Sequence, residues 1–246
     1  MMRKLGVAHS EGRASEVRGE DIRVVGICGV PGVGKTTLAK VVFDKTHDLF
    51  DACSFLPGID LKEFQLSRRM LIADLQMQKP APLESSDEGI EEMANLCRNA
   101  KVLIVLDDVD EDEQIQELAG NLTWFGPGSR IIVTTRKREV LNAFEVGAVD
   151  GQTVEEYKLE PMRDDHALQL FREHAFKGAA PEGVSKYDSL SVDIVKAVGV
   201  LPSDIVDHAS KLSCDMDIDV WKITLELLQK HPEDRPSIQS PFGIRA

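Results

Sequence analysis

The chain has 246 residues, of which 42% are hydrophobic and 29% charged, a composition typical of a globular protein with enough material for a buried core. A formal net charge of −13 disfavours general binding to DNA or RNA, because it would repel the phosphate backbone. We find no apolar stretch suited to a secretory signal or a membrane span, so we expect no membrane span and a cytoplasmic or nucleo-cytoplasmic location.

The first part of the chain is a polar segment followed by a glycine-rich loop between a predicted strand and a predicted helix. Residues 1–21 are polar: Met1–Leu5 is typical of the end of a helix, and Ser10–Ser15 predicts a loop. The apolar run Val24–Cys28 predicts a buried strand, and helical spacing predicts a helix over 35–46. The sequence therefore predicts a strand, a loop and a helix in succession.

The loop fits the phosphate-binding pattern G-x-x-x-x-G-K-[ST]. Its backbone N–H groups can converge on an anion at a helix N-terminus, an approach that a Cβ in place of a glycine hydrogen would prevent. Lys35 is expected near the β- and γ-phosphates, and the Thr36 hydroxyl as a ligand for Mg²⁺. The alternative is a glycine-rich turn before an ordinary helix. The candidate binding residues are Gly29, Val30, Pro31, Gly32, Val33, Gly34, Lys35, Thr36 and Thr37.

A strand and two helices are predicted next. Cys53–Leu56 predicts a strand that ends at Pro57. The segment 61–77 predicts an imperfect amphipathic helix, and a further helix is expected from Ser86, whose hydroxyl can cap it.

The following strand ends in acidic residues. The uninterrupted apolar run 102–106 predicts a central strand, and Asp107 and Asp108 follow it. Ligands of open parallel sheets lie outside the carboxyl ends of the strands, so we expect these residues to converge with the phosphate loop. In this Walker B pattern, Asp107 would hold Mg²⁺ and Asp108 would orient or deprotonate an attacking water. The alternative is that both acids cap a helix at about 111–118.

The remaining strands complete an alternating pattern. Arg130–Thr135 predicts a buried strand, and Arg136 after it is a candidate γ-phosphate sensor or, alternatively, a surface charge. A short helix near 138–144 and a strand near 153–159 are expected next. The alternation predicts an α/β fold of the P-loop NTPase class, with a parallel sheet covered by helices on both faces.

Beyond Pro161 the strand signals stop. Apolar spacing predicts three helices: one capped by Asp164 or Asp165, one around 187–198 and one around 221–228. We therefore expect a polar segment at 1–21, a P-loop domain at 22–160, a partial helical subdomain at 161–231 and a flexible tail at 232–246.

The cysteines and histidines give no metal-binding pattern. The cysteines, Cys28, Cys53, Cys97 and Cys214, form no C-x-x-C pair, and the six histidines are scattered. The cysteines are expected to be small buried side chains in a reducing compartment.

Four blocks of sequence occur in a characteristic order. They are the loop Gly29–Lys40, the segment Leu106–Asp110, the strand Gly128–Arg136 and the segments between Tyr157 and Phe176. Together they resemble NB-ARC, the nucleotide-binding domain of plant disease-resistance receptors, over about residues 22–232. Asp110 closes the segment Leu106–Asp110. At this position the chain resembles the branch whose receptors carry an N-terminal TIR domain, whereas the other large branch usually has Trp.

The resemblance implies a molecular switch in plant defence signalling. In the family, bound ADP holds the resting receptor closed, exchange for ATP permits assembly and immune cell death, and slow hydrolysis resets the switch. For this chain it implies ADP or ATP with Mg²⁺ as cofactors, at most a slow ATPase activity, and other immune receptors or a second copy as protein partners. It also implies that Pro202, in the segment Val200–Ser203, lies near the base.

Some features depart from the family pattern. Ser203 and Asp204 replace apolar residues expected to face the core, so a helix there would bury a carboxylate. We find no Gly-Arg-Glu segment, TIR domain, Met-His-Asp segment or leucine-rich repeat, which suggests a receptor fragment or truncated product. One alternative is therefore an interaction module that pairs with full-length receptors without nucleotide function. A P-loop kinase or GTPase is less favoured, because no Asn-Lys-x-Asp motif for guanine is found.

Overall fold

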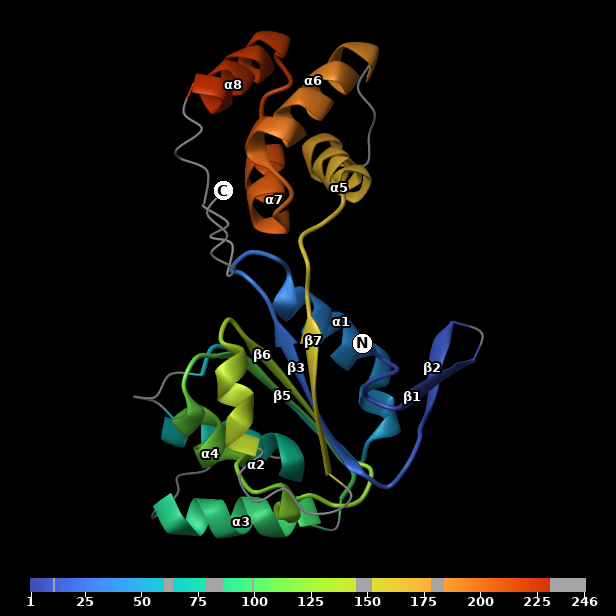
Figure 1. Cartoon of the computed structure of the whole chain (residues 1–246), viewed down its shortest axis with the longest axis vertical. Coiled ribbons are helices and arrows are strands. Elements are labelled where there is room, and N and C mark those ends of the chain that lie inside the picture. Colours follow the sequence, from blue (N-terminus) through green and yellow to red (C-terminus); the bar gives the residue numbers. More distant parts are fainter. Residues whose placement is uncertain are drawn as a thin grey trace, which may run out of the picture. The chain divides into compact units, whose positions relative to one another are not determined.

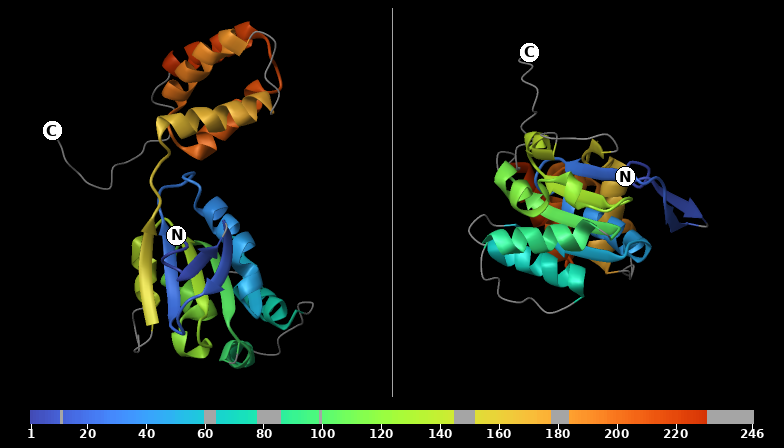
Figure 2. Two further views of the ribbon diagram at one scale, coloured as in Figure 1. Left: turned by 90° about the vertical axis from the view of Figure 1, so that its right-hand side faces the viewer. Right: turned by 90° about the horizontal axis from the view of Figure 1, so that it is seen from below.

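The chain folds into two units. The computed structural model describes residues 1–10, 12–59, 64–77, 86–98, 100–144, 152–177 and 184–230. The first unit contains Met1–Gly29 and Lys35–Leu159, and the second contains Val30–Gly34 and Glu160–Ala246. Figures 1 and 2 show the helices and strands of both units. The tail expected at 232–246 lies outside the described residues.

The first unit is built on a five-stranded parallel sheet with the strand order β4-β5-β6-β3-β7. Each predicted strand is present, with ends that differ by a few residues at most. The strands are β3 (Ile22–Cys28), β4 (Ala52–Leu56), β5 (Val102–Val109), β6 (Arg130–Thr135) and β7 (Gln152–Lys158). Because all of them run in the same direction, their carboxyl ends lie at one edge of the sheet.

Helices cover both faces of this sheet, which confirms the predicted fold class. On β5, Leu103 and Val105 pack with α1 (Lys35–Thr46), whereas Ile104 and Leu106 pack in the cluster that contains α2 (Phe64–Gln76), α3 (Ser86–Arg98) and α4 (Asp112–Ala119). Figure 1 shows α1 on the opposite side of the sheet from α2 and α4. The unit also contains the short 3-10 helices η1 (His47–Leu49), η3 (Leu122–Trp124) and η4 (Arg138–Phe144).

Two predicted helix starts involve residues or side chains that the structure does not describe. Residues 61–63 of the predicted helix 61–77, and the side chain of Ser86, lie outside what the structure describes. The element predicted at 138–144 is present as the 3-10 helix η4.

The N-terminal residues form an antiparallel hairpin, β1 (Val7–Ser10) and β2 (Arg13–Val17). The predictions of a helix end at Met1–Leu5, where the chain makes turns, and of a loop at Ser10–Ser15 are therefore wrong. Leu5 and Val7 are buried in the cluster that also contains α1 residues, but most other side chains of the hairpin are exposed or half-buried. The hairpin consequently lacks the apolar alternation that makes a strand visible in a sequence.

A buried arginine ties the N-terminal residues to the sheet. Arg130, the first residue of β6, is fully buried, and its guanidinium donates hydrogen bonds to the carbonyl oxygens of Leu5, Arg18 and Asp21. Backbone carbonyls thus satisfy a charged group that is costly to bury without partners.

The described residues of the second unit form four helices around an aromatic core: α5 (Asp164–Phe176), α6 (Val184–Val198), α7 (Pro202–Leu212) and α8 (Ile218–Lys230). Trp221 is fully buried, with its ring 5.8 Å from that of Phe171 and 5.0 Å from that of Tyr187, measured between centroids. The three predicted helices are present, and α7 is an additional one. The predicted caps are wrong, because Asp164 and Asp165 lie inside the first turn of α5, where a negative charge also favours the helix.

The start of α7 corrects another prediction. Because α7 begins at Pro202, helical spacing turns Ile205, Ala209 and Leu212 towards the core. Ser203 is exposed and Asp204 only partly buried, so no carboxylate is enclosed and the expectation that both face the core is wrong.

All four cysteines are free thiols: Cys28 and Cys97 are buried, Cys53 is half-buried and Cys214 is exposed. The prediction that all are buried is therefore wrong for Cys214. Within the described ranges, none of the helices combines the length and apolar character needed to cross a membrane.

Candidate functional site

The glycine-rich loop connects β3 to α1 at the carboxyl edge of the sheet. Gly32 and Gly34 have φ angles of 76° and 101°, in the left-handed region where glycine is the favoured residue. Within the second unit, the backbone N–H of Ser203 donates to the carbonyl oxygen of Gly32 at 3.2 Å. A Cβ on Gly32 would lie 2.1 Å from the Ser203 hydroxyl oxygen, so this close approach also requires glycine. Pro202 therefore directly precedes a residue that is bonded to the loop.

Other predicted loop residues differ in exposure. Pro31 is exposed, Val33 is buried and Thr37 is exposed on α1. Lys35 is the first residue of α1 and only 8% exposed, and its Nζ donates to the Gly29 carbonyl oxygen at 2.9 Å. Burial lowers the pKa of Lys35, and the nearby carboxylate of Asp108 acts against this shift.

The Walker B aspartate lies beside the first threonine of α1. The Thr36 hydroxyl donates to Asp107 Oδ1 at 2.8 Å, although the two residues belong to different elements. Asp107 is 5% exposed near the end of β5. The structure thus brings the phosphate loop and the Walker B strand together at the edge of the sheet that holds the carboxyl ends of its parallel strands.

A second hydroxyl, which sequence reasoning missed, holds the same oxygen. Thr134 on β6 donates to Asp107 Oδ1 at 2.6 Å and accepts a hydrogen bond from the Asp108 backbone N–H at 2.8 Å. Thr134 is fully buried. The available signal was a hydroxyl residue directly after the apolar residues 131–133 of β6, but its partner depends on the register between β5 and β6.

Asp108 has an unusual backbone. Its φ is 58°, and the pairing of β5 with β6 is irregular between Leu106 and Val109. Non-glycine residues rarely adopt this conformation, although aspartate tolerates it better than most. The irregularity turns Asp107 inward to the hydroxyls while the Asp108 side chain is exposed.

The alternative interpretation of Asp107 and Asp108 as helix caps is wrong. The residue before α4 is Glu111, and the Gln114 side-chain oxygen accepts hydrogen bonds from the N–H groups of Glu111 at 2.9 Å and Asp110 at 2.7 Å. Polar groups other than the two aspartates therefore satisfy the start of α4.

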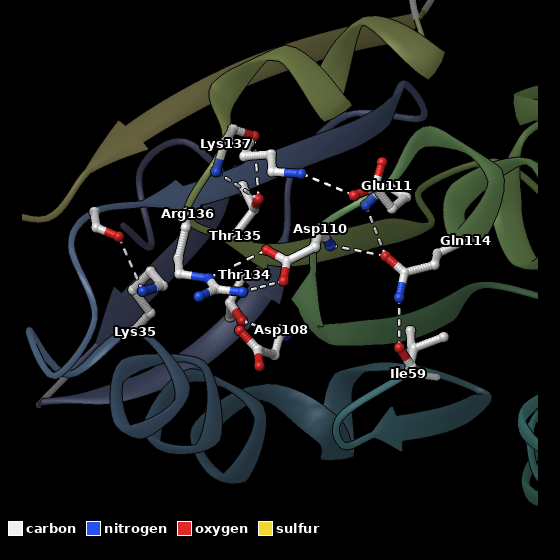
Figure 3. A network of polar contacts seen from close by, with 11 residues as sticks. Lys35, Ile59, Asp108, Asp110, Glu111, Gln114, Thr134, Thr135, Arg136 and Lys137 are labelled. Atoms are coloured by element: carbon white, nitrogen blue, oxygen red, sulfur yellow. Dashed lines mark hydrogen bonds and ion pairs between the residues drawn. The ribbon is translucent and has the colours of Figure 1, made fainter. Parts of the chain in front are cut away.

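Arg136 follows β6 directly and is paired with a carboxylate. Its Nε donates to Asp110 Oδ1 at 3.2 Å, and its Nη2 donates to Asp110 Oδ2. This bond raises the pKa of Arg136. Figure 3 shows the guanidinium between Asp110 and the amine of Lys35. The adjacent Lys137 forms a second ion pair, with Glu111 at 2.8 Å.

The oxygen atoms of Thr36 and Asp107 fit a hard cation that takes most of its other ligands from phosphate and water. Among the described residues, no group of three or more His, Cys, Asp or Glu side chains is arranged to hold a metal ion. Thr36 and Asp107 offer adjacent oxygen atoms, and both hydroxyl bonds to Asp107 use Oδ1. Mg²⁺ is commonly held by one or two protein oxygens together with phosphates and water, so these residues fit it.

Comparisons with known proteins agree with this geometry. The family model for the NB-ARC domain matches residues 13–180. TMV resistance protein N of Nicotiana glutinosa is 33% identical over 221 residues, covering 85% of this chain and 18% of that protein. Disease resistance protein RPV1 of Vitis rotundifolia is 33% identical over 218 residues, covering 87% of this chain and 15% of that protein. The chain thus spans less than a fifth of the length of these relatives.

Solved structures support the fold. Cdc6p from Pyrobaculum aerophilum superposes with a TM-score of 0.51 at 17% identity, covering 87% of this chain and 57% of that one. At this identity the likeness concerns the fold alone. The family match supports nucleotide binding, and the chain belongs to the NB-ARC domain family.

Proposed function

We propose that this chain is an ADP- or ATP-binding switch domain of a plant immune receptor and that it uses Mg²⁺. The observation that carries the proposal is the hydrogen bond between Thr36 and Asp107, which joins a phosphate-loop helix to a Walker B strand. A hydroxyl and a carboxylate at this distance suit a cation bound between protein and phosphate oxygens.

Each residue of the site has a proposed role. Lys35 places its ammonium against the phosphates, and Thr36 and Asp107 hold Mg²⁺, which screens phosphate charge when bound. Asp108, whose carboxylate is exposed, orients an attacking water, and Arg136 contacts the γ-phosphate. The loop from Gly29 to Gly34 with Thr37 binds phosphate oxygens, and Pro202 lies near the base.

The receptor-level function is part of the same proposal. The relatives carry the words "resistance protein" in their names, which supports a role in plant defence signalling. We propose slow ATP hydrolysis that resets the switch, other immune receptors or a second copy as partners, and action in the cytoplasm or nucleus. Asp110 supports the TIR-type branch.

Equilibrium titration tests nucleotide binding. Calorimetric titration with ADP and ATP, with and without Mg²⁺, should show affinity that Lys35→Ala lowers about tenfold or more, because a charge-assisted bond to phosphate is lost. Asp107→Asn should weaken only the Mg²⁺-dependent part. Lys45→Ala, an exposed lysine on the same helix, is the matched control and should bind like the parent. Equal affinities in Lys35→Ala and Lys45→Ala would contradict the proposal.

A further inference from the structure

An ion pair joins the ends of two neighbouring strands at the site. Asp110 follows β5 and Arg136 follows β6, and these strands pair in parallel. We propose that Asp110 is a positioning residue for Arg136, and that this pair sets the preference of the site for a nucleoside triphosphate over a diphosphate. The inference rests on the proposed nucleotide-binding function and deepens it.

The geometry of the pair leaves one edge of the guanidinium for another anion. Asp110 engages Nε at 3.2 Å and also Nη2, which is a two-point contact along one edge of the planar group. Among the residues that the structure describes, Nη1 donates to none. Figure 3 shows the guanidinium lying between the Asp110 carboxylate and Lys35. The remaining edge can therefore meet a phosphate that is also bound by Lys35.

Asp110 is itself held in place. Its backbone N–H donates to Gln114 Oε1 at 2.7 Å, and the Gln114 amide donates in turn to the carbonyl oxygen of Ile59. Gln114 is only 4% exposed, so this support is enclosed in the protein. Asp110 is thus an anchored partner for an arginine that would otherwise sample many rotamers.

The exposure of the pair argues for a role in binding rather than in stability. The side chain of Arg136 is 47% exposed and that of Asp110 27%, and exposed ion pairs contribute little to folding. An arginine already held in its binding orientation loses less conformational freedom when an anion arrives. In the proposed function Arg136 contacts the γ-phosphate, which a diphosphate lacks, so the pair should favour triphosphate.

A neighbouring pair provides a matched control. Lys137 and Glu111 come from the same two strand ends and contact each other at 2.8 Å, and their side chains are about half exposed, at 51% and 52%. Glu111→Gln removes one negative charge from this pair, as Asp110→Asn does from the other. Any general effect of charge on anion binding should therefore appear in both variants.

The test is the ratio of ATP to ADP affinity, measured by titration in the presence of Mg²⁺ on the whole chain. Asp110→Asn should lower this ratio about three- to tenfold, the effect expected when one long side chain is no longer held. Glu111→Gln should leave it unchanged, and Asp110→Glu should restore part of it. In an Arg136→Ala background, Asp110→Asn should have no further effect. Thermal unfolding should be the same for all these variants.

Other results would overturn the inference. An unchanged or higher ratio in Asp110→Asn, or an effect that persists without Arg136, would show that Asp110 does not act by positioning this arginine. If Lys35→Ala weakens the binding of both nucleotides but Asp110→Asn leaves the ratio of ATP to ADP affinity unchanged, only the inference about Asp110 fails. A parent chain that binds neither nucleotide would overturn the proposed function as well.

Discussion

At the scale of single residues, two hydroxyls and one carboxylate oxygen form the centre of the site. Thr36 and Thr134 both donate to Asp107 Oδ1, from α1 and β6 respectively. This arrangement holds the carboxylate in one orientation, and Oδ2 receives no hydrogen bond from any described residue. A cation site needs a carboxylate that its neighbours hold in one orientation and that keeps an oxygen available for the cation.

Removal of the Thr134 hydroxyl should therefore weaken cation binding. Thr134→Val deprives Asp107 of one buried hydrogen bond and leaves the Asp108 N–H without its partner, which should cost about 1–3 kcal/mol of stability. We expect the Mg²⁺ concentration for half-maximal nucleotide binding to rise several-fold. Thr46→Val is a matched control, because Thr46 is also buried and its hydroxyl donates within its own helix, to the Val42 carbonyl oxygen. The same Mg²⁺ dependence in both variants would contradict this role.

The buried amine of Lys35 should make binding sensitive to alkaline pH. In the proposed function the charged ammonium of Lys35 binds the phosphates, and burial lowers the pKa of Lys35 from the ordinary 10.5. Affinity should therefore be full well below the lowered pKa and fall as pH rises through it, starting below pH 10.5. Titrations above about pH 8, where phosphate is fully ionised, measure this loss. Lys35→Met should bind weakly with no such dependence, and a parallel loss in this variant would assign the pH effect to another group.

At the scale of elements, the strands of the sheet could be predicted because burial on both faces gives continuous apolar runs. The segments 102–106 and 131–133 are examples. The hairpin β1–β2 and helix α7 could not be predicted in the same way. The hairpin exposes most of its side chains, and α7 begins with polar residues whose positions depend on where Pro202 starts the helix.

The same distinction applies to the site. Lys35, Thr36 and Asp107 could be singled out because they stand in motifs with fixed spacing. The roles of Thr134 and Asp110 could not, because their contacts depend on the irregular register between β5 and β6. Sequence spacing identifies residues within one loop or strand end, whereas pairs across strands require the three-dimensional structure.

The packing of η4 on β3 gives a test at this scale. Gly26 lies in the middle of β3, and a Cβ there would be 2.3 Å from Leu141 Cδ1. Gly26→Ala should therefore destabilise the protein by about 1–3 kcal/mol through overpacking. Urea unfolding of Gly26→Ala, Leu141→Ala and the double variant should show a double loss smaller than the sum, because Leu141→Ala makes room for the new methyl. Strictly additive losses would show that Leu141 is not the obstacle.

At the scale of the whole molecule, the negative net charge makes nucleotide binding depend on positive charges close to the site. The chain carries a formal charge of −13, so a nucleotide approaches a protein of its own sign. Lys35 and Arg136 supply positive charge near the site, and Mg²⁺ would supply more. This balance is the physical reason to expect that binding depends on Mg²⁺ and on Lys35 together.

The nucleotide content of the purified chain is the most direct test of whether it binds ADP or ATP. The protein is denatured, and the released small molecules are separated by anion exchange beside the same preparation of Lys35→Ala. We expect near-stoichiometric ADP in the parent and none in the variant. A parent that is empty and also fails to take up added ADP or ATP would contradict the claim that this chain is a nucleotide-binding domain.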